Sequence, residues 1–316
     1  MSCCRWRIRP SRKGQARLSE IRATGFLNVN KPLHLTSHDV VAKLRHQYRA
    51  LTGSSKLGHA GTLDPLADGV LVICLGAATR LSDYIMSGRK AYHARISFGA
   101  STTTYDAAGD FLESKSADHI KRSDVERVLP QFIGEIEQVP PMYSAIKVGG
   151  KKLYELARQG QTIKREPRKV TVHSIKILSW RNPVVELEIE CGSGTYIRSL
   201  AHDLGAALDV GGYLSGLTRT ASGAFKFRDS LPLEAIADSG DWLQHITSPY
   251  DALTAYTRVK LNAKDIESLR HGRFIRRQLE ITDHTVFAFD AANQLVAILE
   301  PRAELWKPRK VFLSGS

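Results

Sequence analysis

The chain has 316 residues and a formal net charge of +13, with 45 Lys and Arg against 32 Asp and Glu. This length suggests about two domains, and a hydrophobic content of 42% is normal for a protein with a buried core, which excludes global disorder. No apolar run approaches the roughly 20 residues that are needed to span a bilayer, so we expect no membrane association.

The sequence contains four cysteines, Cys3, Cys4, Cys74 and Cys191. They are too few for a disulfide framework and lack the CxxC or Cys/His spacing of a zinc site. The sequence also has no Walker A motif, no nucleotide-binding GxGxxG after a strand, no HExxH and no GxSxG. We therefore expect a protein of the reducing cytoplasm that uses neither a metal nor a cofactor.

The positive charge is concentrated in three segments. Residues 1–24 hold seven basic residues and one acidic residue, residues 147–169 hold eight and two, and residues 255–316 hold eleven and seven. This distribution predicts a polyanionic partner, of which nucleic acid is the commonest. Residues 1–24 show no sustained periodicity and are predicted to be a disordered arm, for which a solubilising role is an equally good explanation.

The first elements are predicted between residues 25 and 75. Residues 25–30 form an expected strand that Lys31-Pro32 stops. Ser37 is the expected N-cap of a helix whose apolar residues follow helical spacing. Residues 53–69 are rich in Gly, Ser, Thr, Asp and Pro, which predicts a long loop before an apolar strand at 70–75.

The middle of the chain alternates helices and strands. A capping-box pattern at Ser123–Glu126 predicts a helix start. Between residues 185 and 191, apolar side chains alternate with three glutamates, which is typical of a half-buried antiparallel strand. The further helices are expected at 79–86, 151–158 and 195–208, and a further strand at 92–98.

The pattern changes near the C-terminus. A short helix at 265–270 precedes two short strands at 284–289 and 294–299, which predicts a small, mainly β module over residues 255–316. The whole pattern lacks the regular βαβ alternation of a doubly wound sheet. We predict an α+β fold with a central, mainly antiparallel sheet flanked by helices, followed by the C-terminal module.

The segment Gly58-His-Ala-Gly-Thr-Leu-Asp-Pro-Leu-Ala67 places a carboxylate, Asp64, in a loop just before an apolar strand. Loop carboxylates held by a rigid neighbour are good catalytic candidates. An Asp before Pro is more often a turn residue, so spacing alone leaves both interpretations open. Asp68 adds a second carboxylate four residues later, and we interpret it as a solvated loop residue.

This segment resembles the active-site motif of the TruB-type tRNA pseudouridine-55 synthases. Other segments resemble motifs of that family in the same order: residues 25–32 its opening strand, 89–92 its second motif, 140–147 and 152–158 its thumb, and 192–200 the segment with its active-site arginine. The similarity covers about residues 25–230. More weakly, residues 269–273 and 306–311 resemble a PUA-like RNA-binding module.

The resemblance implies a pseudouridine synthase domain over residues 25–254, with an RNA-binding thumb at about 140–170, and a PUA-like module over 255–316. The implied reaction converts uridine 55 in the T-arm loop of tRNA to pseudouridine. The uridine is flipped out, the N1–C1′ bond breaks and a C5–C1′ bond forms, without a cofactor. We expect a monomer with no obligatory protein partner.

The resemblance also implies roles for particular residues. Asp64 is the catalytic carboxylate that attacks C1′ or removes a ribose proton, Arg198 is its counter-ion, and Tyr92 stacks on the base and handles the proton at C5. The implied substrate-binding residues are His59, Tyr196, Leu217, Lys147, Lys151 and Lys152. Ordinary roles remain open: core burial for the tyrosines and Leu217, local hydrogen bonds for His59, phosphate binding for Arg198, and a solvated face for the lysines.

Two other functions share the motif. A tRNA-binding or folding chaperone with little turnover would also grip and flip tRNA. An RNA-guided ribonucleoprotein synthase would carry the same catalytic residues and a PUA module. Activity on unmodified tRNA without a guide RNA separates these from a stand-alone enzyme.

Overall fold

The computed structural model describes residues 24–312 except residues 145, 162, 239 and 279. The predicted basic arm therefore lies outside the described residues, apart from Thr24. In the part of the chain that is described, no helix is both long and apolar enough to cross a membrane.

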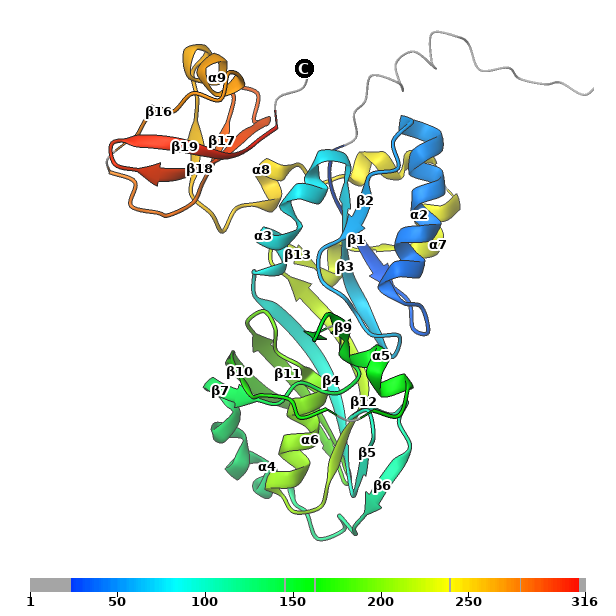
Figure 1. Cartoon of the computed structure of the whole chain (residues 1–316). Helices are drawn as coiled ribbons and strands as arrows, with labels where there is room; N and C mark the ends of the chain where they lie inside the picture. Colours follow the sequence, from blue (N-terminus) through cyan, green and yellow to red (C-terminus); the bar gives the residue numbers. More distant parts are fainter. Residues whose placement is uncertain (1–23, 145, 162, 239, 279, 313–316) are drawn as a thin grey trace, which may run out of the picture.

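A mixed, mainly antiparallel sheet of ten strands runs through the molecule (Figure 1). Its order is β14-β1-β3-β12-β4-β11-β10-β7, with β13 paired to β12 and β2 to β3. Within it, the pairs β1–β14 and β3–β12 are parallel. The strands are β1 (Gly25–Lys31), β2 (Leu57–His59), β3 (Ala67–Leu75), β4 (Lys90–Phe98), β7 (Gly134–Gln138), β10 (Arg168–Arg181), β11 (Val184–Cys191), β12 (Gly212–Ser222), β13 (Phe225–Lys226) and β14 (Leu231–Pro232).

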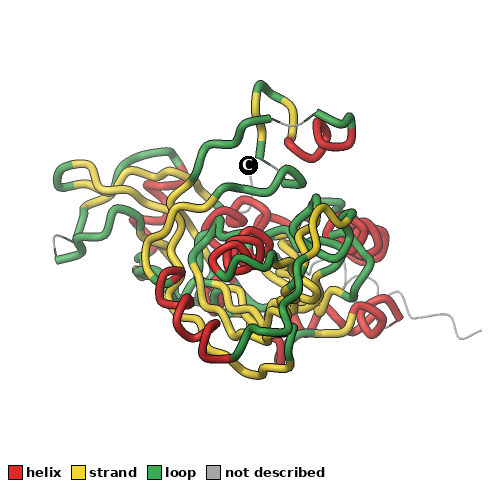
Figure 2. Tube along the Cα trace, turned by 90° about the horizontal axis from the view of Figure 1, so that it is seen from below, coloured by secondary structure: helices red, strands yellow, loops and turns green. Residues whose placement is uncertain are grey.

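Helices flank this sheet, which confirms the predicted fold class. In the view from below (Figure 2) the strands form a curved band with helices packed against it. The helices of this part are α2 (Ser37–Thr52), α3 (Ser82–Met86), α4 (Arg122–Val128), α5 (Leu153–Arg158), α6 (Ile197–Ala207), α7 (Leu233–Asp238) and α8 (Pro249–Ala252). The short 3-10 helices are η1 (Gly76–Leu81), η2 (Leu129–Phe132), η3 (Phe227–Asp229) and η4 (Gly240–His245). Two separate hairpins pair β5 (Ala100–Thr102) with β6 (Phe111–Ser114) and β8 (Lys147–Val148) with β9 (Lys151–Lys152).

Two hydrophobic clusters lie along this sheet. One packs α6 and α4 against β4 and β11, and the other packs α2 and α7 against β1 and β3. Leu217 on β12 contacts both clusters. The apolar residues predicted to share one face of β11 are fully buried, from Val185 to Cys191, so that alternation is confirmed. The active-site loop described below therefore lies where the two clusters meet.

The C-terminal module is a five-stranded sheet of order β15-β17-β18-β19-β16 with α9 (Ala263–Arg270) beside it. Its strands are β15 (Arg258–Lys260), β16 (Ile275–Arg276), β17 (Val286–Phe289), β18 (Leu295–Arg302) and β19 (Leu305–Val311). The sequence predicted β17 and β18 and missed β19. Phe287 and Phe289 pack in one hydrophobic cluster with Phe26 and Val70, so the module shares buried surface with the central sheet.

Three expected element starts are wrong, each for a local reason. Thr36, not Ser37, caps α2, because the Ser37 hydroxyl bonds the main chain of Leu63 instead. Lys121 is the N-cap of α4, and its amide donates to the Asp124 carboxylate, so the cap lies two residues earlier than Ser123 predicts. The predicted helix at 151–158 begins only at residue 153 because β9 pairs with β8. The predicted loop at 53–69 contains β2.

One close approach fixes α6 on the sheet. A Cβ atom added at Gly205 of α6 would lie 2.1 Å from the amide nitrogen of Gly212, at the start of β12. Gly212 is equally restricted, since its Cβ would lie 2.7 Å from the carbonyl oxygen of Ala201. The helix therefore needs glycine at the crossing to reach its position on the sheet.

Replacing Gly205 by alanine is expected to lower the free energy of unfolding by about 3 kcal/mol, because backbone must move to admit the methyl group. Urea denaturation followed by circular dichroism measures the change. Ala206→Ser, which adds an atom at the adjacent exposed position, is the matched control and should change stability by less than about 0.5 kcal/mol. Equal stabilities of the two variants would contradict the close-packing argument.

Candidate active site

Asp64 lies in the loop that joins β2 to β3, and both sides of it are anchored by hydrogen bonds. On the N-terminal side, the Leu63 amide donates to the Ser37 hydroxyl at 2.8 Å. On the C-terminal side, the His34 amide donates to the Pro65 carbonyl at 2.7 Å, and the Ala67 amide donates to the Asp64 carbonyl at 3.0 Å. The Asp64 side chain itself is 42% exposed. A fixed backbone thus presents a carboxylate that solvent still reaches.

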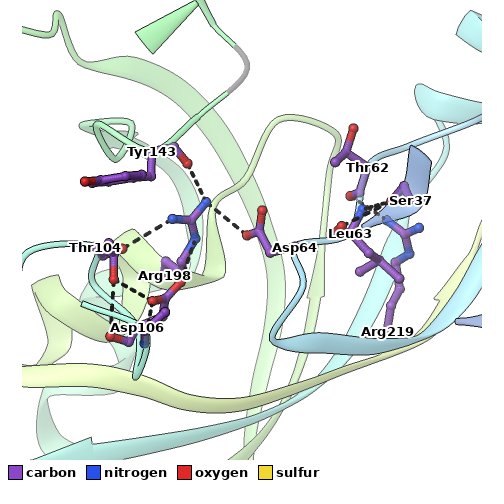
Figure 3. A network of polar contacts seen from close by, with 10 residues as sticks. Ser37, Thr62, Leu63, Asp64, Thr104, Asp106, Tyr143, Arg198 and Arg219 are labelled. Carbon is purple, nitrogen blue, oxygen red and sulfur yellow. Dashed lines mark hydrogen bonds and ion pairs between the residues drawn. The ribbon is translucent and has the colours of Figure 1, made fainter. Parts of the chain in front are cut away.

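Arg198, from the first turn of α6, meets this carboxylate (Figure 3). Its guanidinium Nη2 lies 2.9 Å from Asp64 Oδ2 and also donates to the Tyr143 carbonyl at 2.8 Å. Nη1 donates to the Thr104 carbonyl at 3.3 Å, and Nε lies 3.6 Å from Asp106 Oδ2. The Arg198 side chain is only 6% exposed. Asp64 and Arg198 lie next to each other as predicted, but the guanidinium is shared among three segments instead of being bidentate on Asp64.

Asp106 is a member of this network that the sequence did not reveal. It is buried, and its Oδ1 accepts hydrogen bonds from the Thr104 hydroxyl at 2.5 Å and the Ala108 amide at 3.0 Å. It lies in a turn between β5 and β6, where neither periodicity nor a capping pattern marks it. Arg198 is therefore held between two carboxylates, one buried and one half exposed.

Tyr92 is buried in β4, directly opposite Arg219 of β12. The Arg219 guanidinium donates to the main-chain carbonyls of Val70, Gly61 and Thr62 at 2.7, 3.0 and 3.4 Å. Burial raises the pKa of Tyr92 above its ordinary value, so the phenol is neutral near pH 7. The sequence predicted Tyr92 and missed Arg219.

His59 ends β2 and is half-buried. Burial, and then the nearby Arg219 charge, lower the pKa of His59, so its imidazole is neutral at pH 7. Its Nδ1 is buried and has no hydrogen-bond partner among the described residues. An uncharged ring with a spare polar atom fits a contact with RNA as well as a local structural role.

Leu217 lines a small pocket together with Asp64 and Arg198, and Tyr196 precedes α6, the helix that carries Arg198. The main chain of Tyr196 is held by the buried Gln138 side chain, which accepts from its amide at 2.7 Å and donates to its carbonyl at 3.0 Å. Burial raises the pKa of Tyr196. Gln138 is a second positioning residue that no sequence pattern marked.

A small pocket adjoins the Asp64–Arg198 pair. Its cavity volume is about 10 Å³, roughly the room for one water. Of the predicted residues, Asp64, Arg198 and Leu217 line it, together with Leu66, Ala67, Asp106, Leu214 and Gly216. Tyr92, His59 and Tyr196 do not line it. A pyrimidine base needs more space, so some of these walls must move when a base enters.

The predicted basic residues Lys147, Lys151 and Lys152 form the β8–β9 hairpin, in which Lys147 pairs with Lys152. Their side chains lie outside what the structure describes. Nearby, Arg165 donates to the Pro140 carbonyl at 3.1 Å. Across the described residues, no group of three His, Cys, Asp or Glu side chains gathers where it could hold a metal ion.

Comparisons with known proteins identify the family of this chain. A family model for the N-terminal domain of TruB family pseudouridylate synthases matches residues 49–197. A tRNA pseudouridine synthase B from Dehalococcoides mccartyi is 43% identical over 92% of this chain and 97% of its own length. The chain belongs to the TruB family of pseudouridine synthases. A second relative of that name, from Synechocystis, is 47% identical over 79% of this chain and 84% of its own.

The fold is also that of a solved pseudouridine synthase. A chain of a crystal structure titled as a Cbf5-Nop10-Gar1 complex superposes with a TM-score of 0.72 at 26% identity, covering 93% of this chain and 87% of that one. This TruB family member therefore shares its architecture, including the C-terminal module, with a protein that was crystallised with partners.

Lys31 on β1 and Asp68 on β3 are two further charged residues with buried atoms in this TruB family member. Lys31 is fully buried, and its Nζ donates to the carbonyls of Pro32 and Leu35 at 2.9 and 2.8 Å. Asp68 was expected to be a solvated loop residue. It lies instead in β3 opposite Thr218, with Oδ1 buried. Burial lowers the pKa of Lys31 to about 8, and the charges of Asp68 and Asp64 partly oppose this.

This depressed pKa predicts how stability changes with pH. Between about pH 8 and 10.5 the unfolded chain keeps a proton on Lys31 that the folded chain has lost, so folding becomes more favourable as pH rises. Relative to Lys31→Met, the wild type should gain about 2 kcal/mol of unfolding free energy between pH 7.5 and 9.5. Urea denaturation at several pH values measures this difference. A difference that is constant with pH would contradict the assignment.

Proposed function

We propose that this protein isomerises uridine 55 in the T-arm loop of tRNA to pseudouridine, with Asp64 as the catalytic carboxylate. The observation that carries the proposal is the buried Arg198 guanidinium, which lies 2.9 Å from the half-exposed carboxylate of Asp64 beside a pocket. The relatives named tRNA pseudouridine synthase B, similar over nearly the whole chain, support tRNA as the substrate.

The chemistry explains why a carboxylate and a guanidinium belong together here. Breaking the N1–C1′ bond of uridine develops positive charge at C1′, which an adjacent carboxylate stabilises or attacks. When RNA covers the site, the carboxylate loses contact with water, and the adjacent Arg198 guanidinium replaces that water as its hydrogen-bond partner.

Tyr92 has the properties that the C5 proton step requires. Burial raises the pKa of its phenol, which is therefore neutral at pH 7. In the proposed complex the ring contacts the everted base, and the hydroxyl relays the proton that leaves C5 by passing its own proton to water. Asp64 then has to act only at the sugar.

RNA must supply the energy to evert the uridine, a cost of roughly a few kcal/mol. We assign this to phosphate contacts of Lys147, Lys151 and Lys152 in the thumb and of the basic C-terminal module. His59 supports the everted conformation, and Tyr196 and Leu217 border the base. Residues 25–254 act as the catalytic domain in this proposal, with the thumb at 140–170 and an RNA-binding module at 255–316.

The proposed enzyme works as a monomer in the cytoplasm, without an obligatory protein partner. The test is incubation of the purified protein with an unmodified tRNA transcript, followed by mapping of pseudouridine at nucleotide resolution. Conversion at position 55 supports the proposal. Conversion only with a guide RNA or an added protein would favour a ribonucleoprotein enzyme, and tight binding without conversion would favour a folding chaperone.

Replacing Asp64 by asparagine is expected to reduce pseudouridine formation by at least about 10⁴-fold, because an amide neither stabilises C1′ nor attacks it. Binding of tRNA, measured by filter retention, should change by less than threefold. Asp68→Asn makes the same chemical change four residues away and should stay within fivefold of the wild-type rate. Substantial turnover by the Asp64 variant would refute its role.

Replacing Arg198 by lysine is expected to lower the rate on bound tRNA by about 10²-fold or more. One ammonium cannot reach oxygens on three separate segments, so the Asp64 carboxylate loses its position and its partner. Single-turnover kinetics at saturating enzyme measures the effect. Arg127→Lys on α4, where the side chain is 73% exposed, is the matched control and should match the wild type. Wild-type rates for both variants would remove Arg198 from the site.

A further inference from the structure

Arg219 is among the largest fully buried side chains of the protein, with only 2% of the residue exposed. The described residues contain no carboxylate within ion-pair distance of its guanidinium, which bonds main-chain carbonyls instead. A buried cation without an ion pair carries a large desolvation cost that hydrogen bonds offset only in part. Such an arrangement is more costly than an apolar residue would be, which points to a role beyond packing.

The carbonyls that Arg219 holds bracket the catalytic loop. Gly61 and Thr62 precede Asp64 by three and two residues, and Val70 follows it within β3. The main chain also fits closely here, since a Cβ atom on Gly69 would lie 2.4 Å from the Arg219 carbonyl oxygen. One guanidinium therefore fixes the two ends of the segment that carries Asp64.

The same residue faces Tyr92 at paired positions of β12 and β4. Burial raises the pKa of Tyr92, and the nearby Arg219 charge partly opposes this. Because arginine offers only hydrogen-bond donors, a bond from Arg219 to the Tyr92 oxygen would leave the hydroxyl proton for another group. Arg198, in contrast, holds Asp64 from the opposite side and makes no contact with Tyr92 that the structure describes.

We propose that Arg219 is the positioning residue that keeps the Asp64 loop and Tyr92 in one fixed arrangement. In this arrangement Asp64 acts on the sugar and Tyr92 acts on the base of the same nucleotide. This inference rests on the proposed function, because it assigns separate tasks to Asp64 and Tyr92. It adds a second arginine to the site, which acts through the groups it holds and does not touch the RNA.

The test uses the full-length variants Arg219→Lys and Arg219→Gln with a tRNA transcript. Single-turnover rates at saturating enzyme should fall about tenfold for lysine, which keeps the charge, and about 10²-fold for glutamine, which loses it. The dissociation constant for tRNA should stay within twofold of the wild type in both. Rates within twofold of the wild type, or a loss explained wholly by weaker tRNA binding, would overturn the proposal.

A double-mutant cycle examines the link to Tyr92. If Arg219 acts through the Tyr92 hydroxyl, the combined Tyr92→Phe and Arg219→Lys variant should lose at least fivefold less rate than the product of the single losses. Strictly multiplicative losses would overturn the link. The cycle uses the lysine variant alone, so it is decisive even if Arg219→Gln does not fold, which a thermal melt reveals.

Arg127→Gln, on an exposed helix of the same domain, is the control and should match the wild type in both rate and binding. The activity of the wild type on the tRNA transcript distinguishes failure of the proposed function from failure of this inference. An inactive wild-type protein on the tRNA transcript would refute the proposed function, whereas an active wild type with equally active Arg219 variants would refute only this inference.

Discussion

A guanidinium taken out of water has to find oxygen atoms for its five N–H groups, and this requirement organises the active site around Arg198. Its partners come from the Asp64 loop, from the turn that carries Thr104 and Asp106, and from Tyr143 at the base of the thumb. These segments are far apart in the sequence. Loss of any one of them would leave a buried donor unpaired, so a network with one segment missing would be less stable than the complete one.

The loop that carries Asp64 lies between two such cations. Arg198 contacts the carboxylate, while Arg219 contacts the main chain on both sides of it. The first interaction orients the Asp64 carboxylate, and the second controls where its backbone lies. Because the two arginines come from different elements, α6 and β12, the closely packed crossing of Gly205 and Gly212 sets the distance between them.

The sequence predicted the fold class and the Asp64–Arg198 pair because both depend on signals that are local or carried by motifs. Alternation at 185–191 reports a strand with one buried face, and the motif around Asp64 is continuous in the chain. The sequence did not reveal Asp106 and Arg219 because their partners are distant in the chain. Arg198 lies 94 residues from Thr104, which is in the same turn as Asp106, and Arg219 lies 158 residues from Gly61. Main-chain carbonyls carry no side-chain identity, so no pattern of residue types records that they are bound.

The position of β1 has a consequence for synthesis of the protein on the ribosome. This strand is among the first parts of the described chain to emerge, yet one of its edges is covered by β14 and Phe26 pairs with Thr247. More than 200 residues must be translated before those groups exist. Until then Phe26 and Leu27, both fully buried in the finished protein, are covered only in part, and the nascent chain offers an open strand edge to chaperones and to other nascent chains.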